Sequence, residues 1–203
     1  MTDAITTIDL LRHGEPVGGT RFRGALDDPL SDLGWQQMDA AVGAHPAWQA
    51  VVSSPLRRCA AFAASLAERH GLPLEEAEGF REIGFGEWEG RTAQELMEVA
   101  PEALSRFWSD PRGHTPPGGE PFEAFAARVA AAWEGLLARQ AGSRVLLVSH
   151  GGVIRLILAY ILQMPLANLF RLEVPYASLS RIRVEGAGAD ALPQLVFHGR
   201  TLA

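Results

Sequence analysis

Apolar residues gather in short continuous runs along the chain, and stretches with helical spacing or turn-forming residues separate these runs. Runs of this kind are typical of strands that are covered on both faces of a parallel sheet. The runs interpreted as strands cover residues 6–11, 49–54 and 144–149, with two later ones at 176–185 and 193–199. Apolar residues recur with helical spacing over about 32–44, 55–70, 121–140 and 152–162. The alternation predicts an α/β fold, a three-layer α/β/α sandwich with a mostly parallel central sheet and its last two strands antiparallel at an edge.

One less regular segment, about 84–120, interrupts this alternation. Turn-forming residues crowd its second half, in "SDPRGHTPPGGEP". Long irregular segments inside a compact domain are often functional lids. A chain of 203 residues with 47% hydrophobic content is long enough to bury one core. We therefore predict a single domain over residues 1–203 with a small lid at about 84–120, which holds a short helix near 92–109.

Charge and hydropathy restrict the kind of ligand. The formal net charge is −6, and the longest basic run is Arg57-Arg58, so nucleic acid is not the expected partner. The first residues lack the basic cluster of a secretory signal, and the longest apolar stretch, 156–166, is too short to span a bilayer. A single cysteine, Cys59, fits a reducing compartment. These features predict a soluble cytoplasmic protein that acts on a small molecule, without a membrane partner.

All 18 basic side chains are arginine, because the chain contains no lysine. This excludes P-loop nucleotide binding, protein-kinase chemistry and Schiff-base catalysis, each of which depends on a particular lysine. Arginine must therefore bind any anionic ligand, and its planar guanidinium group suits two-point contacts with phosphate or carboxylate.

Two histidines follow predicted strands, and each is followed by glycine: His13 in "IDLLRHGEP" and His150 in "VLLVSHGGV". Ligands of open parallel sheets bind outside the carboxyl ends of the strands. A glycine after each histidine lets the backbone approach a ligand closely, and a helix that starts near Gly152 would direct its N-terminus there. The pair predicts an anion site; the alternative is that both histidines are structural.

A third strand end supplies a cation. Ser54 is a suitable N-cap and Pro55 a suitable first residue for the helix after the strand at 49–54. Arg58 shares a helical face with Phe62, whereas Arg57 points elsewhere. A charge on an apolar face needs a counter-charge, so Arg58 is the better anion ligand and Arg57 the better solvated residue. The alternative is that both arginines lie at the surface.

Five motifs now point to a known family. They are "RHGE" at 12–15, Ser-Pro-Leu-x-Arg at 54–58, "REIGFGEWEG" at 81–90, "PPGGE" at 116–120 and "SHGG" at 149–152. Their types and order resemble those of the histidine phosphatase superfamily, which has the phosphoglycerate mutase-like fold, and they span essentially the whole chain. The resemblance implies phosphoryl transfer through a phosphohistidine.

The resemblance also implies a role for individual residues. His13 is the implied nucleophile and Glu82 the implied general acid, which must carry a proton to protonate the leaving alcohol. The implied phosphate-binding residues are Arg12, Arg58, His150 and Gly151. A neutral imidazole is a competent nucleophile near pH 6 to 7, and the arginines would neutralise the transferring group.

Two positions stay open. Spacing alone does not choose among Glu82, Glu87 and Glu89, and only the resemblance favours Glu82. Relatives often carry threonine and asparagine after "RHGE", where this chain has Pro16 and Gly19. An amide donor to phosphate is therefore missing. Arg21, Thr20 or Arg23 are its candidate replacements; Arg23 is favoured, with a solvated loop arginine as the alternative.

Other catalytic sites do not fit the sequence. No arginine stands six residues after Cys59, no HExxH or paired Cys/His spacing indicates zinc, and "GFGEWEG" departs from a dinucleotide fingerprint. We therefore expect no metal and no cofactor, and metal-independent hydrolysis with an acidic to neutral optimum.

The phosphoglycerate mutases that the chain resembles generally have a longer cap and use further basic residues, including lysine. This chain is short and lysine-free, so the resemblance implies hydrolysis rather than mutase activity. Among the phosphatases, it most resembles the α-ribazole phosphatase type, which acts in cobalamin biosynthesis. The alternatives are a broad-specificity acid or sugar phosphatase, a phosphoglycerate mutase-type phosphotransferase, and a non-catalytic protein that binds a phosphorylated ligand. An apolar C-terminal edge at 174–184 would suit a homodimer, although core packing explains it equally well.

Overall fold

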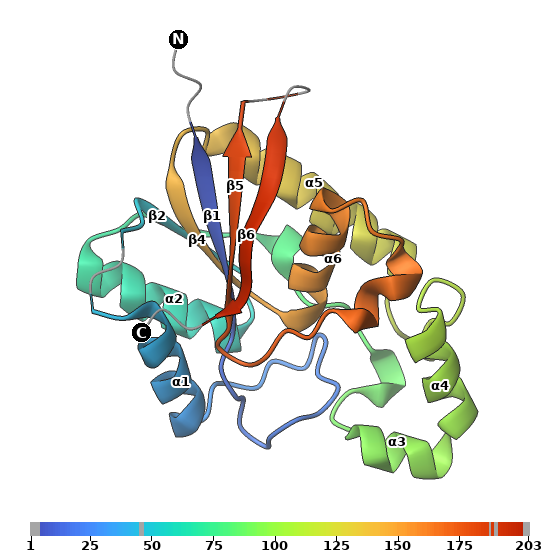
Figure 1. Cartoon of the computed structure of the whole chain (residues 1–203). Helices are drawn as coiled ribbons and strands as arrows, with labels where there is room; N and C mark the ends of the chain where they lie inside the picture. Colours follow the sequence, from blue (N-terminus) through green and yellow to red (C-terminus); the bar gives the residue numbers. More distant parts are fainter. Residues whose placement is uncertain (1–4, 45–46, 187, 189–190, 201–203) are drawn as a thin grey trace.

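A six-stranded sheet forms the centre of the part of the chain that the structure, a computed structural model, describes: residues 5–44, 47–186, 188 and 191–200. The strands are β1 (Thr6–Arg12), β2 (Ala50–Ser53), β3 (Leu74–Glu76), β4 (Arg144–Ser149), β5 (Leu179–Glu185) and β6 (Leu192–Arg200). Their order across the sheet is β3-β2-β4-β1-β5-β6 (Figure 1). Strands β1 to β4 pair in parallel, whereas β5 pairs antiparallel with both β1 and β6. The predicted mostly parallel sheet with an antiparallel edge is confirmed.

Helices cover both faces of this sheet (Figure 1). The α-helices are α1 (Asp32–Val42), α2 (Arg57–His70), α3 (Ala93–Val99), α4 (Pro101–Ser109), α5 (Phe122–Arg139) and α6 (Gly151–Ile161). Three short 3-10 helices are η1 (Glu78–Phe80), η2 (Gly86–Trp88) and η3 (Leu166–Arg171). Side chains of α1 and α2 pack in one core cluster, and side chains of α5 and α6 pack in another. Among the described residues, no helix is long and apolar enough to cross a membrane.

The central strands explain the continuous apolar runs. In β4, Val145 and Leu147 belong to the core under α5 and α6, whereas Leu146 and Val148 belong to the core under α1 and α2. All four side chains are fully buried. Since successive strand side chains point to opposite faces, a strand with a core on each face needs an apolar residue at every position.

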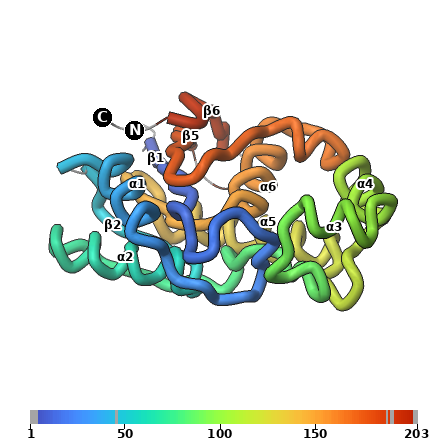
Figure 2. The backbone as a smooth tube through the Cα atoms, turned by 90° about the horizontal axis from the view of Figure 1, so that it is seen from below, coloured from blue at the N-terminus to red at the C-terminus, as the bar shows by residue number. Residues whose placement is uncertain are grey.

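Helices α3 and α4 form a small lobe beside the main layers, at one end of the molecule in Figure 2. Trp88, Leu96, Leu104 and Phe107 bury their side chains together there as a separate apolar cluster. The segment was predicted to hold one short helix near 92–109. It holds two, because Ala100 leaves the helical conformation and Pro101 starts a new helix.

Two further predictions need correction. Ser54 is not the N-cap of α2: the helix begins at Arg57 with Leu56 at the N-cap position, and the backbone N–H of Arg57 donates to Oδ1 of Asp27 over 2.7 Å. The predictions also omitted β3, whose sequence Leu-Glu-Glu has no apolar run; it forms because the edge of β2 accepts a parallel partner.

Candidate active site

The structure brings His13 and His150 together at one edge of the sheet. They follow β1 and β4, which pair in parallel with Arg12 opposite Ser149. Their ring centroids lie 5.2 Å apart at an interplanar angle of 64°. His13 is 6% exposed and His150 is fully buried. The predicted juxtaposition of the two histidines is therefore confirmed.

The ring of His13 is held in one orientation by its neighbours. Its Nδ1 lies 2.7 Å from the carbonyl oxygen of Gly14, so Nδ1 carries a proton that it donates to this oxygen. Burial lowers the pKa of His13 well below its ordinary value, and the charges of Arg12 and Arg58 lower it further. The imidazole is therefore neutral near pH 7, and Nε2 has its lone pair available for attack on an electrophile.

His150 is also neutral, and it lies behind His13. Burial lowers its pKa well below the ordinary value, with a further contribution from Arg58. Its Nε2 is hydrogen bonded to Oγ of Ser54 over 2.7 Å, and the same hydroxyl oxygen accepts from the backbone N–H of Leu56 over 3.3 Å. His150 is not among the residues that line the cleft beside His13.

Arg12 and Arg58 flank the histidines, and both are held by backbone carbonyl groups. Arg58 is 1% exposed; its Nη1 and Nη2 each donate over 2.8 Å, to Leu26 and Gly24. Nη1 of Arg12 donates to Val174. The Nε atom of each arginine is buried and has no hydrogen-bond partner within the part of the chain that the structure describes. Because an unpaired buried donor is costly, two of them beside a neutral histidine suit an oxyanion.

These groups open into a cleft of about 290 Å³. Its lining combines charged, polar and aromatic residues: Arg12, His13, Thr20, Arg21, Phe22, Arg23, Gly24, Arg58, Glu82, Phe85, Ala93, Phe107, Trp108, Gly151, Arg155, Phe170 and Tyr176. The predicted pair of Arg58 as buried ligand and Arg57 as exposed residue agrees with their burial.

The geometry separates the three candidate glutamates. Glu82 lines the cleft, and its carboxylate accepts a hydrogen bond of 2.9 Å from the backbone N–H of Gly152. Glu89 instead accepts from backbone N–H groups of Ala25, Leu26 and Phe85, so it fixes a loop. Glu87 is exposed and outside the cleft lining.

Arg128 and Glu120 hold the segment that carries Glu82. Nε and Nη2 of Arg128 donate to the two carboxylate oxygens of Glu120 over 2.7 and 2.8 Å. The same guanidinium donates to the carbonyl oxygens of Gly79, Arg81 and Glu82 over 3.1, 2.7 and 3.0 Å. We call this arrangement the Arg128 clamp. It fixes the backbone at Glu82 from outside the cleft.

Arg23, the favoured replacement for the missing amide donor, does not fit the alternative of a solvated loop residue, because it is 5% exposed. It lines the cleft, but all three nitrogens of its guanidinium are hydrogen bonded to residues of its own loop. Nε pairs with Asp28 over 2.9 Å, and Nη1 and Nη2 each donate over 2.6 Å, to Gly19 and Val17. Arg23 therefore braces the loop after β1.

Sequence reasoning missed two residues beside the phosphate-binding candidates. The guanidinium of Arg12 lies 4.0 Å from the ring centroid of Tyr176, which also lies 5.7 Å from the His13 ring. Arg155 lines the cleft, and its position four residues after Gly151 on α6 is the signal that indicates a shared helical face.

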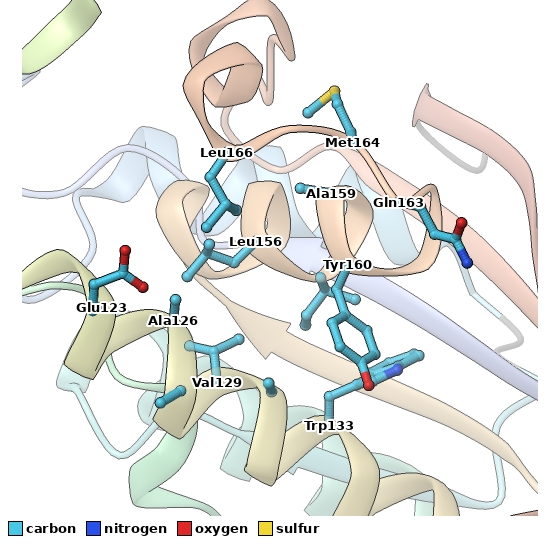
Figure 3. A pocket seen from close by; sticks show the side chains of 13 residues that line it. Glu123, Ala126, Val129, Trp133, Leu156, Ala159, Tyr160, Gln163, Met164 and Leu166 are labelled. Carbon is cyan, nitrogen blue, oxygen red and sulfur yellow. The ribbon is translucent and has the colours of Figure 1, made fainter. Parts of the chain in front are cut away.

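A separate cavity of about 400 Å³ lies between α5 and α6. Figure 3 shows apolar side chains such as Val129, Leu156 and Met164 around it. Glu123 is its only charged lining residue in the described part of the chain, so it offers none of the groups needed for phosphoryl transfer. Also within the described residues, no group of three or more His, Cys, Asp or Glu side chains is arranged to hold a metal ion.

Comparisons with a family model and with individual proteins point to the same family. The sequence model of the histidine phosphatase superfamily (branch 1) matches residues 8–193. The chain is 37% identical over 170 residues to a glucosyl-3-phosphoglycerate phosphatase of Mycolicibacterium vanbaalenii, covering 78% of this chain and 75% of that protein. It is 30% identical over 179 residues to an adenosylcobalamin/alpha-ribazole phosphatase of Salmonella typhimurium, covering 86% of this chain and 89% of that protein.

Solved structures agree with the sequence relatives. The structure of mycobacterial glucosyl-3-phosphoglycerate phosphatase Rv2419c with VO3 superposes with a TM-score of 0.82 at 32% identity, over 96% of this chain and 99% of that chain. The first curated relatives that the chain matches are mycobacterial proteins 35% identical over 192 residues; the alignment covers 92% of this chain but only 52% of their length. The chain thus spans about half of those proteins.

Proposed function

The chain belongs to the histidine phosphatase superfamily, and from this membership we propose that it hydrolyses phosphomonoesters of small metabolites through a phosphohistidine at His13. One observation carries the proposal: a neutral His13 lies beside two buried arginine Nε–H groups without partners, those of Arg12 and Arg58. A phosphoryl group would supply the missing acceptors and be within reach of the nucleophile.

In the first step, Nε2 of His13 attacks phosphorus, and the bond from phosphorus to the ester oxygen breaks. The electron pair of that bond goes to the alcohol oxygen, which takes a proton from Glu82. Arg12 and Arg58 offset the negative charge on the transferring group, and the N-terminus of α6 at Gly151 adds a favourable dipole.

In the second step, a water molecule attacks the phosphorus of the phosphohistidine. The phosphorus–nitrogen bond breaks and returns its electron pair to Nε2, while the Glu82 carboxylate accepts the proton of the water. Inorganic phosphate leaves, and His13 is neutral again. A direct contact between His150 and the phosphoryl group stays a prediction, because His150 lies outside the cleft lining.

The relatives act on different substrates by name, glucosyl-3-phosphoglycerate and α-ribazole compounds. We therefore propose a small phosphorylated metabolite as the substrate class, with α-ribazole 5′-phosphate and glucosyl-3-phosphoglycerate as the first two compounds to assay. The orphaned Nε donors alone would also suit a protein that only binds a phosphorylated ligand. The position of Glu82 at the cleft supports catalysis, because simple binding needs no proton donor.

The test is hydrolysis of p-nitrophenyl phosphate in excess EDTA by the native protein, His13→Ala and His70→Ala. His70 is an exposed histidine at the end of α2 and serves as the matched control. We expect activity that survives the chelator, is lost at least about 1,000-fold in His13→Ala and is unchanged in His70→Ala. Retention of activity in His13→Ala would refute the mechanism.

A further inference from the structure

The cleft beyond the arginines is lined by aromatic rings. Phe22, Phe85, Phe107, Trp108 and Phe170 form what we call the aromatic wall. The ring centroids of Phe22 and Phe85 lie 5.0 Å apart, those of Phe85 and Phe107 6.0 Å, and those of Phe107 and Phe170 5.5 Å. Four of the rings thus form a continuous series, and Trp108 lines the same cleft. The members come from the loop after β1, the segment before η2, α4 and η3.

Part of this wall is exposed although it is apolar. Trp108 is 41% exposed and Phe170 is 38% exposed, whereas Phe107, which packs against the Phe170 ring, is 3% exposed and belongs to the lobe core. A contiguous exposed apolar surface inside a cleft is the usual mark of a ligand-binding surface rather than of core packing.

Two of the arginines on this side of the cleft, Arg21 and Arg23, donate several hydrogen bonds to the protein itself. Nε of Arg21 donates to Gly18 over 3.0 Å and Nη1 donates to Gly90 over 2.7 Å. Arg23 is engaged by the loop in the same way.

Arg155, whose guanidinium lies 6.0 Å from the Phe170 ring centroid, donates from Nε to Leu172 over 2.8 Å. Among the described residues, Glu82 is the only carboxylate in the cleft lining, and it lies at the phosphoryl end. Beyond Thr20 and Arg155, the outer cleft therefore offers a potential ligand mainly aromatic faces.

We propose that the cleft selects phosphomonoesters whose alcohol carries a flat aromatic ring, which lies against the aromatic wall while the phosphoryl group contacts Arg12 and Arg58. This inference rests on the proposed function, because it assigns the leaving group of the same site. Aromatic faces favour ring contacts over contacts with hydroxyl groups, which would lose water without gaining partners.

The test compares 2-phenylethyl phosphate with glycerol 1-phosphate. Both are esters of primary alcohols, so their intrinsic reactivity is similar and the comparison measures recognition of the leaving group. We expect kcat/KM to be about 30-fold higher for 2-phenylethyl phosphate, in the range that a modest apolar contact supplies.

Variants locate the preference. Trp108→Ala and Phe170→Ala should each lower the ratio of the two kcat/KM values about fivefold, through a higher KM for 2-phenylethyl phosphate, with glycerol 1-phosphate nearly unaffected. Tyr160→Ala is the matched control, because Tyr160 is 51% exposed and lies outside this cleft. It should leave the ratio unchanged.

Three results would overturn the inference: a ratio near one or below, a higher kcat/KM for 3-phosphoglycerate than for 2-phenylethyl phosphate, or equal losses on both substrates in the wall variants. Calorimetric binding of the same two esters to His13→Ala decides the preference without turnover. If the native protein hydrolyses neither these esters nor p-nitrophenyl phosphate, the proposed function fails, but tighter binding of the aromatic ester would still support the aromatic site and equal binding would refute it.

Discussion

The Arg128 clamp gives a sharp test of how this fold positions its proposed acid. In Arg128→Met, the side chain keeps its apolar stem but loses every donor to Glu120 and to the carbonyl groups at 79–82. Arg128 does not line the cleft beside His13. We therefore expect a change in turnover to act mainly through the position of Glu82, since Arg128 otherwise influences the site through a small charge effect on the pKa of His150.

The magnitude follows from burial. Breaking a fully buried ion pair by removing one partner costs about 3–5 kcal/mol. The side chains of Arg128 and Glu120 are 27% and 23% exposed, so water compensates part of the loss. We expect the free energy of unfolding to fall by about 2–3 kcal/mol.

The kinetic measurement compares two substrates whose leaving groups differ in their need for a proton. p-Nitrophenolate leaves without a proton, whereas an alkoxide needs one from the acid. A displaced Glu82 should therefore slow hydrolysis of 2-phenylethyl phosphate about 100-fold, with a much smaller effect on p-nitrophenyl phosphate. Urea unfolding and kcat for the two substrates supply the measurements.

Arg139→Met is the matched control on the same helix. Arg139 pairs with Glu75 over 2.7 Å, but the two side chains are 52% and 42% exposed. This pair should contribute less than about 1 kcal/mol and nothing to catalysis. The reasoning is refuted if Arg128→Met is no less stable than Arg139→Met, or if it slows both substrates equally.

Two further predictions concern the site itself. Burial, together with neighbouring arginines, holds the pKa of both His13 and His150 well below 6.5, so below pH 6.5 the unfolded chain binds protons that the folded chain does not. The free energy of unfolding should therefore fall as pH decreases below 6.5, by up to about 1.4 kcal/mol per pH unit for each histidine; a value that is constant or higher at pH 5.5 in urea denaturation would contradict this. A Cβ at Gly152 would collide with the Glu82 carboxylate. Gly152→Ala should therefore slow the hydrolysis of 2-phenylethyl phosphate about 100-fold and that of p-nitrophenyl phosphate little. Equal rates of 2-phenylethyl phosphate hydrolysis for the native and variant proteins would contradict the role of Glu82 as the acid.

The sheet and the two histidines were predictable because the relevant signals are local. A strand buried on both faces must be apolar throughout, and parallel strands place their carboxyl ends at one edge. His13 and His150 follow two such strands, so both were expected at the same edge, and the pairing of β1 with β4 brings them into contact. β3 was not predictable in this way, because its three residues carry no burial pattern and depend on the free edge of β2.

Residues that act through distant partners could not be assigned from sequence. Serine is a common N-cap residue, but the hydroxyl of Ser54 is hydrogen bonded to His150, which lies 96 positions away in the sequence. Glu82, Glu87 and Glu89 are the same residue type within one motif, so spacing could not identify the general acid among them. Only the resemblance to the family favoured Glu82. Only the folded chain puts Gly152 beside one of the three, and Ala25 and Leu26 beside another.

Arg23 shows how the same residue type can serve the site indirectly. Gly18 and Gly19 adopt positive φ values of 83° and 71°, which bend the loop after β1. This bend directs the carbonyl groups of Val17 and Gly19 at the Arg23 guanidinium, and Asp28 completes its hydrogen bonding. A guanidinium satisfied on three sides gains little from a phosphate, whereas Arg12 and Arg58 each keep a buried donor without a partner. The proposed phosphoryl site therefore depends on those two arginines, and Arg23 contributes by fixing the loop whose Gly24 carbonyl binds Arg58.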